Sequence, residues 1–133
     1  MKKILFSISL LFCLSSFAFA IEGGKRYTLY QTDNMYTFLK LDTRTGAIWQ
    51  VHWSTDGIGR AIVPLSTKVL SSDTTNGRFA LFPTKNMYNF ILLDTIDGST
   101  YQVQWSWEKE NRILLKINYL DVNDDLSLSK FAL

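Results

Sequence analysis

The sequence has little of the chemistry on which thiol or metal sites depend. Its 133 residues include one cysteine, Cys13, and one histidine, His52. Cys13 lies in an apolar N-terminal segment that we expect to be removed, so the folded domain has no disulfide, thiolate nucleophile or cysteine-bound metal. A single histidine excludes a multi-histidine metal site and makes any catalytic triad depend on His52. We therefore expect no metal, no cofactor and no enzymatic activity.

The first 20 residues have the pattern of a secretory signal peptide. Lys2 and Lys3 precede the apolar run 4–17, and Ala18-Phe19-Ala20 has the small-residue spacing of a cleavage site. The apolar run is too short and wrongly flanked for a stable membrane anchor. The alternative is a buried N-terminal helix. The pattern predicts cleavage after Ala20, a periplasmic or secreted protein of residues 21–133, and no membrane insertion after cleavage.

The remaining chain also has no excess of charge of either sign. Without Lys2 and Lys3, 12 basic and 12 acidic side chains are left. A net charge near zero gives no electrostatic basis for binding nucleic acid or an anionic membrane. A chain of this length forms one domain, and without disulfides it depends on its core for stability.

A repeat occupies most of this domain. Residues 26–66 align with residues 78–118 at a constant offset of 52, without a gap, and 16 of the 41 pairs are identical. Residues 67–77 then form a linker, whose end from 71 is small or polar and is predicted to be a mobile loop, and 119–133 form a C-terminal tail. A repeat of this length indicates one supersecondary unit present twice.

Each unit has the pattern of four short β-strands. In the first unit the expected strands are 26–30, 35–42, 49–54 and 60–63, and the second unit has matching strands, of which the last is 112–117. Between the second and third strands, Asp42 and Gly46 are matched by Asp94 and Gly98. Asp begins such turns by accepting backbone N–H bonds, and Gly takes the positive-φ position that ends them. Pro64 indicates a strand end or a sheet edge.

The third strand of each unit alternates between two kinds of side chain. Aromatic and aliphatic residues are predicted to point inward and the polar residues outward. The inward row is Trp49, Val51 and Trp53 in the first unit and Tyr101, Val103 and Trp105 in the second; the outward row is Gln50, His52, Gln102 and Gln104.

These patterns predict an all-β fold. Two tandem four-stranded antiparallel units with pseudo-two-fold symmetry are expected to form a sandwich or a flattened barrel, because each sheet must bury an apolar face. The two aromatic rows are expected to meet at the pseudo-axis. Helical periodicity is missing, with the exception of residues 124–133, where a short helix or an extended tail is possible.

Two resemblances follow from the repeat. Asp42-x-x-Thr45-Gly46-x-x-Trp49 resembles the Asp-x-x-Thr-Gly-x-x-x-Trp pattern of quinoprotein-type β-propeller blades, with the tryptophan one position early. A propeller needs about four blades or more, so we interpret this resemblance as shared hairpin geometry without a shared cofactor. The longer pattern Asn-Met-Tyr-x-Phe-x-x-Leu-Asp-Thr-x-x-Gly-x-x-x-Gln-Val-x-Trp-Ser is similar to small secreted two-repeat all-β proteins of uncharacterised function, and it implies no particular activity.

Candidate binding residues are aromatic or neutral polar. Trp107 is the leading one, because its repeat counterpart is Thr55 and the fold does not require an aromatic ring there. Exposed aromatic rings stack on sugars or anchor protein interfaces, although core burial is an alternative. The candidates are Trp107, Gln50, His52, Gln102, Gln104, Tyr36 and Tyr88.

Acidic residues suggest two further sites. Asp42 and Asp94 could form a glycosidase pair, but each begins an identical turn, which already explains it. Asp121, Asn123 and Asp125 resemble the first half of an EF-hand loop. That motif needs glycine where Leu126 stands and glutamate at position 132, where the chain has alanine, so a solvated acidic turn is the simpler interpretation.

The sequence therefore predicts an exported, non-enzymatic binding protein. The first hypothesis is a protein-binding inhibitor or immunity-type protein that neutralises a toxin or hydrolase in the periplasm. The alternatives are a carbohydrate- or peptidoglycan-binding module and a structural envelope protein that self-associates. The identity of the partner and the oligomeric state are left open.

Overall fold

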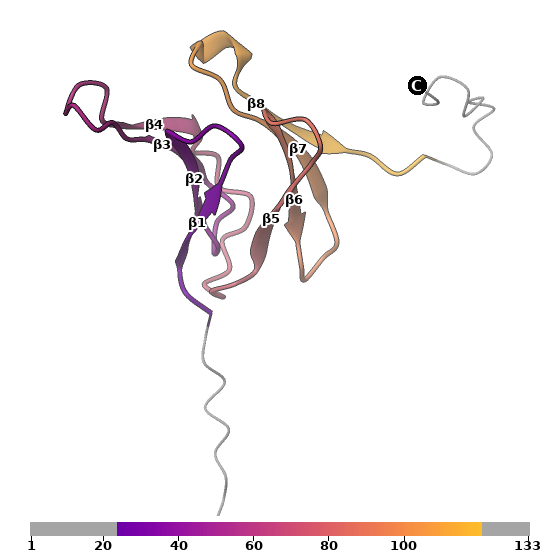
Figure 1. Ribbon diagram of the computed structural model, residues 1–133. Coiled ribbons are helices and arrows are strands. Elements are labelled where there is room, and N and C mark those ends of the chain that lie inside the picture. The colour runs from indigo at the N-terminus through magenta and orange to yellow at the C-terminus, as the bar shows by residue number, and fades with distance from the viewer. Residues whose placement is uncertain (1–23, 121–133) are drawn as a thin grey trace, which may run out of the picture.

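The computed structural model describes residues 24–120 and confirms the all-β fold with two four-stranded antiparallel sheets (Figure 1). Sheet 1 contains β1 (Tyr27–Gln31), β2 (Thr37–Asp42), β3 (Ile48–His52) and β4 (Ala61–Ser66), in that order. Sheet 2 contains β5 (Phe79–Pro83), β6 (Asn89–Asp94), β7 (Thr100–Gln104) and β8 (Ile113–Ile117). A 3₁₀ turn, η1 (Lys109–Asn111), lies between β7 and β8. Among these described residues, no helix is long and apolar enough to cross a membrane.

The repeated Asp–Gly turns form as the sequence predicts. The Asp42 carboxylate accepts the Arg44 N–H at 3.0 Å, and the Asp42 carbonyl accepts the Gly46 N–H at 2.9 Å. Gly46 has φ +81°, and Gly98 in the second unit has φ +79°. A side chain at these two positions would strain the backbone, which explains why glycine is kept in both copies. Asp42 therefore has the turn role expected for it.

The edge predicted from Pro64 is also present. Pro64 lies in β4, the outermost strand of sheet 1, opposite Trp49 of β3. The register between β3 and β4 shifts at this point. Proline fits here because an edge strand has backbone groups with no ladder partner, so the missing N–H costs nothing.

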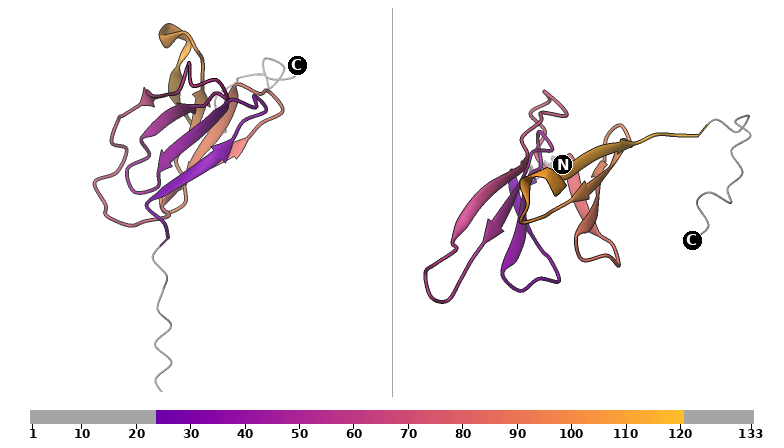
Figure 2. Two further views of the ribbon diagram at one scale, coloured as in Figure 1. Left: turned by 60° about the vertical axis from the view of Figure 1, so that its left-hand side comes forward. Right: turned by 90° about the horizontal axis from the view of Figure 1, so that it is seen from above.

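The two sheets pack face to face without closing into a barrel (Figures 1 and 2). The inner face of sheet 1 contributes aliphatic side chains to the core, and sheet 2 contributes larger aromatic ones. The buried core consists of Leu39, Leu41 and Ile48 from sheet 1 and Phe79, Leu81, Phe90, Leu92, Val103 and Trp105 from sheet 2.

Equivalent positions of the repeat lie on opposite sides: the sheet face that is buried in the second unit is the outer face in the first. Trp105 is 0% exposed in the core, whereas its counterpart Trp53 is 39% exposed on the outer face of sheet 1. Both indoles have the same local geometry, since each N–H donates at 2.8 Å to the carbonyl of a methionine 18 residues earlier in the chain. The acceptor is Met35 for Trp53 and Met87 for Trp105. The predicted inward row is therefore correct for the second unit and wrong for the first, and the two aromatic rows do not meet.

The cause lies in the chemistry of the sheet faces. Each unit carries large apolar side chains on both faces, so alternation alone does not decide which face is covered. The linker decides it by fixing the start of β5 beside the first turn. There the Phe79 N–H donates to the Thr43 carbonyl at 2.9 Å, and the Gly77 N–H donates to the Thr43 hydroxyl at 2.8 Å. The Leu70 N–H also donates to the Thr45 carbonyl at 2.7 Å.

Candidate functional site

The centre of the candidate site is a contact between Gln50 and the backbone of Ser106, which joins the two sheets. The Gln50 amide nitrogen donates to the Ser106 carbonyl at 2.9 Å, and the Gln50 amide oxygen accepts the Ser106 N–H at 3.0 Å. Gln50 is fully buried. Because Ser106 presents one donor and one acceptor, this pair fixes the orientation of the Gln50 amide.

His52 continues this polar cluster. Its Nδ1 lies 3.0 Å from the Thr37 hydroxyl, and its Nε2 lies 3.1 Å from the Gln50 amide nitrogen. Since the Gln50 nitrogen can only donate, Nε2 accepts and Nδ1 carries the proton. The imidazole also stacks on the Trp107 ring, with 3.9 Å between ring centroids and 23° between planes. Burial and the nearby positive charge of Arg112 lower the pKa of His52 below its ordinary value.

The outward placement expected for Gln50 and His52 is therefore wrong. Both are buried between the sheets, where every hydrogen-bonding group of the Gln50 side chain has a partner. Burial of polar side chains is tolerated when their hydrogen bonds are complete. The sequence signal for an outward row was alternation, and alternation is equally compatible with a polar row that meets polar backbone from the other sheet.

Gln102 and Gln104 do not join this cluster. Gln102 is on the outer face of sheet 2, where its amide nitrogen donates to the Asn89 side chain at 3.1 Å. Gln104 is partly buried and donates to the Asn111 carbonyl at 2.9 Å. The outward placement is thus correct for Gln102 and holds only in part for Gln104.

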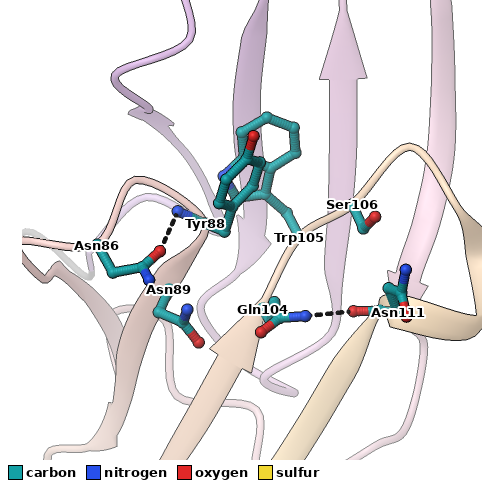
Figure 3. A pocket seen from close by; sticks show the side chains of 7 residues that line it. All are labelled: Asn86, Tyr88, Asn89, Gln104, Trp105, Ser106 and Asn111. Atoms are coloured by element: carbon teal, nitrogen blue, oxygen red, sulfur yellow. Dashed lines mark hydrogen bonds between the residues drawn. The ribbon is translucent and has the colours of Figure 1, made fainter.

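A polar hollow of about 220 Å³ opens beside Gln104 (Figure 3). In Figure 3 Tyr88 stands over Trp105, with ring centroids 5.0 Å apart, while amide side chains surround the opening below. The residues that line the hollow are Asn86, Tyr88, Asn89, Gln104, Trp105, Ser106 and Asn111.

Another hollow, of about 280 Å³, lies at the corresponding end of the first unit and is more apolar in character. Four of its lining positions correspond to the first hollow through the repeat, namely Tyr36, Trp53, Ser54 and Gly59. We call it the loop-end hollow, because it lies where β2 begins and β3 ends. Tyr36 packs on Trp53 with 5.4 Å between ring centroids, and Trp107 borders the same hollow. Ile58, between Gly57 and Gly59 in the β3–β4 loop, is 79% exposed there. Four large apolar side chains, Tyr36, Trp53, Ile58 and Trp107, therefore gather at one place on the surface.

The two carboxylates that could suggest catalysis are bound by arginine side chains. Arg26 donates to the Asp42 carboxylate at 3.2 Å, and Arg78 donates to the Asp94 carboxylate at distances from 2.8 to 3.0 Å. Burial by itself raises the pKa of Asp94, but the hydrogen bonds from Arg78 and from the Ile96 backbone outweigh it and hold that pKa below its usual value.

A metal centre is not formed by these groups either. Between residues 24 and 120, the structure contains no group of three or more histidine, cysteine, aspartate or glutamate side chains that could hold a metal ion. The motif around Asp121, Asn123 and Asp125 lies outside the described residues, as does the predicted signal peptide.

Sequence reasoning missed three members of the site. Trp53 was assigned to the core because its counterpart Trp105 belongs there. Ser106 takes part through its backbone, which no side-chain pattern reveals. Ile58 did carry a signal, because an isoleucine between two glycines in a polar loop has no role in a sheet and no apolar counterpart in the second unit.

No protein-family model, curated protein or solved structure matches the chain.

Proposed function

We propose that the chain is a non-enzymatic, exported protein-binding protein whose contact surface is the loop-end hollow. The observation that carries this proposal is the clustering of Tyr36, Trp53, Ile58 and Trp107 around one hollow of about 280 Å³. Tryptophan and tyrosine are enriched among the residues that dominate binding energy at protein interfaces. Loops held by a rigid β-scaffold are a common place for such residues.

The surroundings of this hollow favour a protein partner over a small ligand. Ile58 and Trp107 protrude from their loops, with exposures of 79% and 56%. Protruding apolar side chains insert into a pocket of a partner, whereas a small-molecule site encloses its ligand. Under this proposal the protein acts in the periplasm or outside the cell as an inhibitor or immunity-type protein. Its target would be a toxin or hydrolase with a complementary apolar pocket.

A second candidate function rests on the polar hollow of Figure 3. Tyr88 presents an aromatic ring, and Asn86, Asn89, Gln104 and Asn111 surround it with amide groups. An aromatic face beside neutral donors and acceptors is suited to the apolar face and hydroxyl groups of a sugar ring. This combination favours a glycan, including a peptidoglycan fragment, as the ligand of that hollow.

Affinity capture from envelope extracts, followed by calorimetry with the purified partner, tests the protein-binding proposal. Ile58→Ala and Trp107→Ala should each weaken binding by at least about tenfold, as expected for residues at the centre of an interface. Ile96→Ala is the matched control, because Ile96 is 57% exposed but lies in the β6–β7 turn at the opposite end of the sheets. If the two loop-end variants bind like the control, the loop-end hollow is not the contact surface.

The glycan candidate needs a separate measurement. Titration with soluble peptidoglycan fragments and a panel of oligosaccharides should change the tryptophan fluorescence if the Figure 3 hollow is occupied, because Trp105 lines it. Tyr88→Ala should remove that change, and Tyr36→Ala should leave it intact. Fluorescence that stays constant across the panel would eliminate this candidate.

A further inference from the structure

Both sheets have an outer face that is rich in exposed apolar side chains. On sheet 1 these include Leu29, Trp53 and Ile62, and on sheet 2 they include Phe82 and Leu115. Monomeric proteins rarely leave extended apolar surface uncovered. A sheet with two apolar faces is typical of a sheet that is covered on both sides.

The repeat relates each outer face to the buried face of the other sheet. The outer face of sheet 1 is the counterpart of the buried face of sheet 2: Leu29, 59% exposed, corresponds to Leu81, 3% exposed, as Trp53 corresponds to Trp105. The outer face of sheet 2 is in turn the counterpart of the buried face of sheet 1, so that Ile91 corresponds to the fully buried Leu39. The chain thus has two pairs of complementary sheet faces. One pair forms the internal sheet–sheet interface, and the other pair is exposed.

We propose that the outer face of sheet 1 in one copy packs on the outer face of sheet 2 in a second copy, repeating the internal interface between molecules. The occupant is a second copy of this chain because only the chain itself is shown to offer the complementary face. The internal interface supplies the template for its register. This self-association goes beyond the proposed function and uses the sheet faces, which share only Trp53 with the loop-end hollow.

A polar contact supports the same arrangement. Internally, Gln50 binds the backbone of Ser106 through both groups of its amide. The counterparts are Gln102, which is exposed on the outer face of sheet 2, and Ser54 at the end of β3. In the proposed contact, Gln102 of one copy donates to the Ser54 carbonyl of the next and accepts its N–H. This explains why glutamine stands at both positions although only one is buried.

The symmetry of the contact follows from its geometry. The two faces differ, so the contact is heterologous, and such contacts form rings when the rotation between copies closes. Rings of stacked four-stranded sheets typically contain about four to eight sheets. Each copy supplies two sheets, so a closed ring would contain two to four copies.

One residue makes the proposed contact weaker than its internal template. Lys40 stands on the outer face of sheet 1 where the second unit has the fully buried Leu92. Its amino group lies 4.7 Å from the centroid of the Trp49 ring. Covering this face removes water from an ammonium group, which is costly even with the ring contact. The assembly is therefore expected to be reversible on dilution, and Lys40→Leu should tighten it.

The loop-end hollow stays largely accessible in such an assembly. Tyr88 is 45% exposed although the sheet face next to it is covered, so its counterpart Tyr36 is expected to remain exposed as well. Trp107 and Ile58 are on loops outside the sheet faces. Of the four loop-end side chains, only Trp53 becomes buried.

Sedimentation velocity and light scattering on the purified protein test the proposal. The wild type should form one discrete species of two to four copies that dissociates on dilution. Leu29→Lys changes the outer face of sheet 1, and Leu115→Lys changes the outer face of sheet 2. Each variant should be monomeric at concentrations where the wild type is assembled. Ile96→Lys places the same charge on an equally exposed side chain away from both faces, and it should assemble like the wild type.

Mixing the two variants distinguishes this contact from all symmetric ones. Leu29→Lys retains an intact face on sheet 2, and Leu115→Lys retains an intact face on sheet 1. An equimolar mixture should therefore form a 1:1 dimer that grows no further. A wild type that remains monomeric up to millimolar concentration would overturn the proposal, as would a mixture that stays monomeric. Circular dichroism confirms that each variant is folded. Neither result depends on the external partner proposed above.

Discussion

The Gln50 side chain bonds both backbone groups of Ser106, which follows β7 in the second unit. The donor distance is 2.9 Å and the acceptor distance is 3.0 Å, across 56 residues of sequence. This pair ties the polar cluster around His52 to the end of β7. Its counterpart, Gln102, is exposed and makes no such contact with residues 24–120.

Gln50→Ala should destabilise the domain much more than Gln102→Ala. The first substitution leaves the Ser106 N–H and the His52 Nε2 without a partner, whereas the Ser106 carbonyl still accepts from Arg112 Nε at 2.9 Å. An unsatisfied buried group costs roughly 1–3 kcal/mol. The second removes an exposed amide. Urea unfolding of both variants, at concentrations where the chain is monomeric, measures the difference. Equal losses would show that the contact across the sheets contributes no net stability.

Trp105→Ala should lower the free energy of unfolding by about 3–5 kcal/mol, because the ring is fully buried in the core. Trp53→Ala should cost far less in the monomer, because that indole is 39% exposed on the outer face. Both variants lose the same chemistry, including one indole N–H bond to a methionine carbonyl, so the comparison isolates burial. Matching destabilisation would contradict the observed choice of faces.

His52 should make the stability fall as the pH drops below about 7. Burial lowers its pKa in the folded state, so the unfolded chain binds a proton more readily. The stabilising contribution of neutral His52 is complete above its ordinary pKa of about 6.5 and is lost as the pH falls toward the lowered value. His52→Gln, which introduces the residue found at position 104, should flatten this profile. A profile unchanged by the substitution would refute the assignment.

Trp107→Ala should raise the pKa of His52 toward its ordinary value. The Trp107 ring covers one face of the imidazole at 3.9 Å, and its removal readmits water. His52 is the only histidine in the chain, so its NMR titration is free of overlap. Ile58→Ala, which changes the same hollow without touching His52, serves as the control and should leave the titration in place.

Asp94→Asn should destabilise the protein at neutral pH by roughly 1.5–3 kcal/mol, because Arg78 loses a charged hydrogen-bond partner. Asn still caps turns, so the substitution mainly removes the charge. The carboxylate contributes fully above its ordinary pKa of about 3.9, and the contribution is lost as the pH falls through the lowered folded value. The wild type and the variant should therefore converge in stability below pH 4. A constant difference down to pH 2 would contradict this account.

Much of the fold follows from local sequence signals. The Asp–Gly turns, the four strands in each unit and the edge position of Pro64 are set by short-range geometry, and the structure confirms them. The expected second strand began at Met35 but β2 begins at Thr37, because the Asn34 side chain accepts the Tyr36 N–H at 2.9 Å and holds those residues in the turn.

The candidate site was harder to predict. The structure places Trp107 against His52 and on the same hollow as Tyr36, a grouping that the sequence did not predict, and Gln50 and His52 were assigned to the wrong side of sheet 1. Ser106 contributes only its backbone, and Trp53 has a sequence environment nearly identical to that of Trp105. No property of either tryptophan's neighbours in sequence separates the buried ring from the exposed one.

The sequence by itself determined the elements of this protein: two copies of one four-stranded unit, their turns, and the alternation of side chains along each strand. These depend on backbone conformation and on residues a few positions apart. The tertiary structure alone decided which face of each sheet is covered, because both faces carry large apolar side chains and the choice depends on how the linker places β5 beside Thr43. That choice buries Trp105, Gln50 and His52, and it leaves Trp53 and the outer faces of both sheets at the surface.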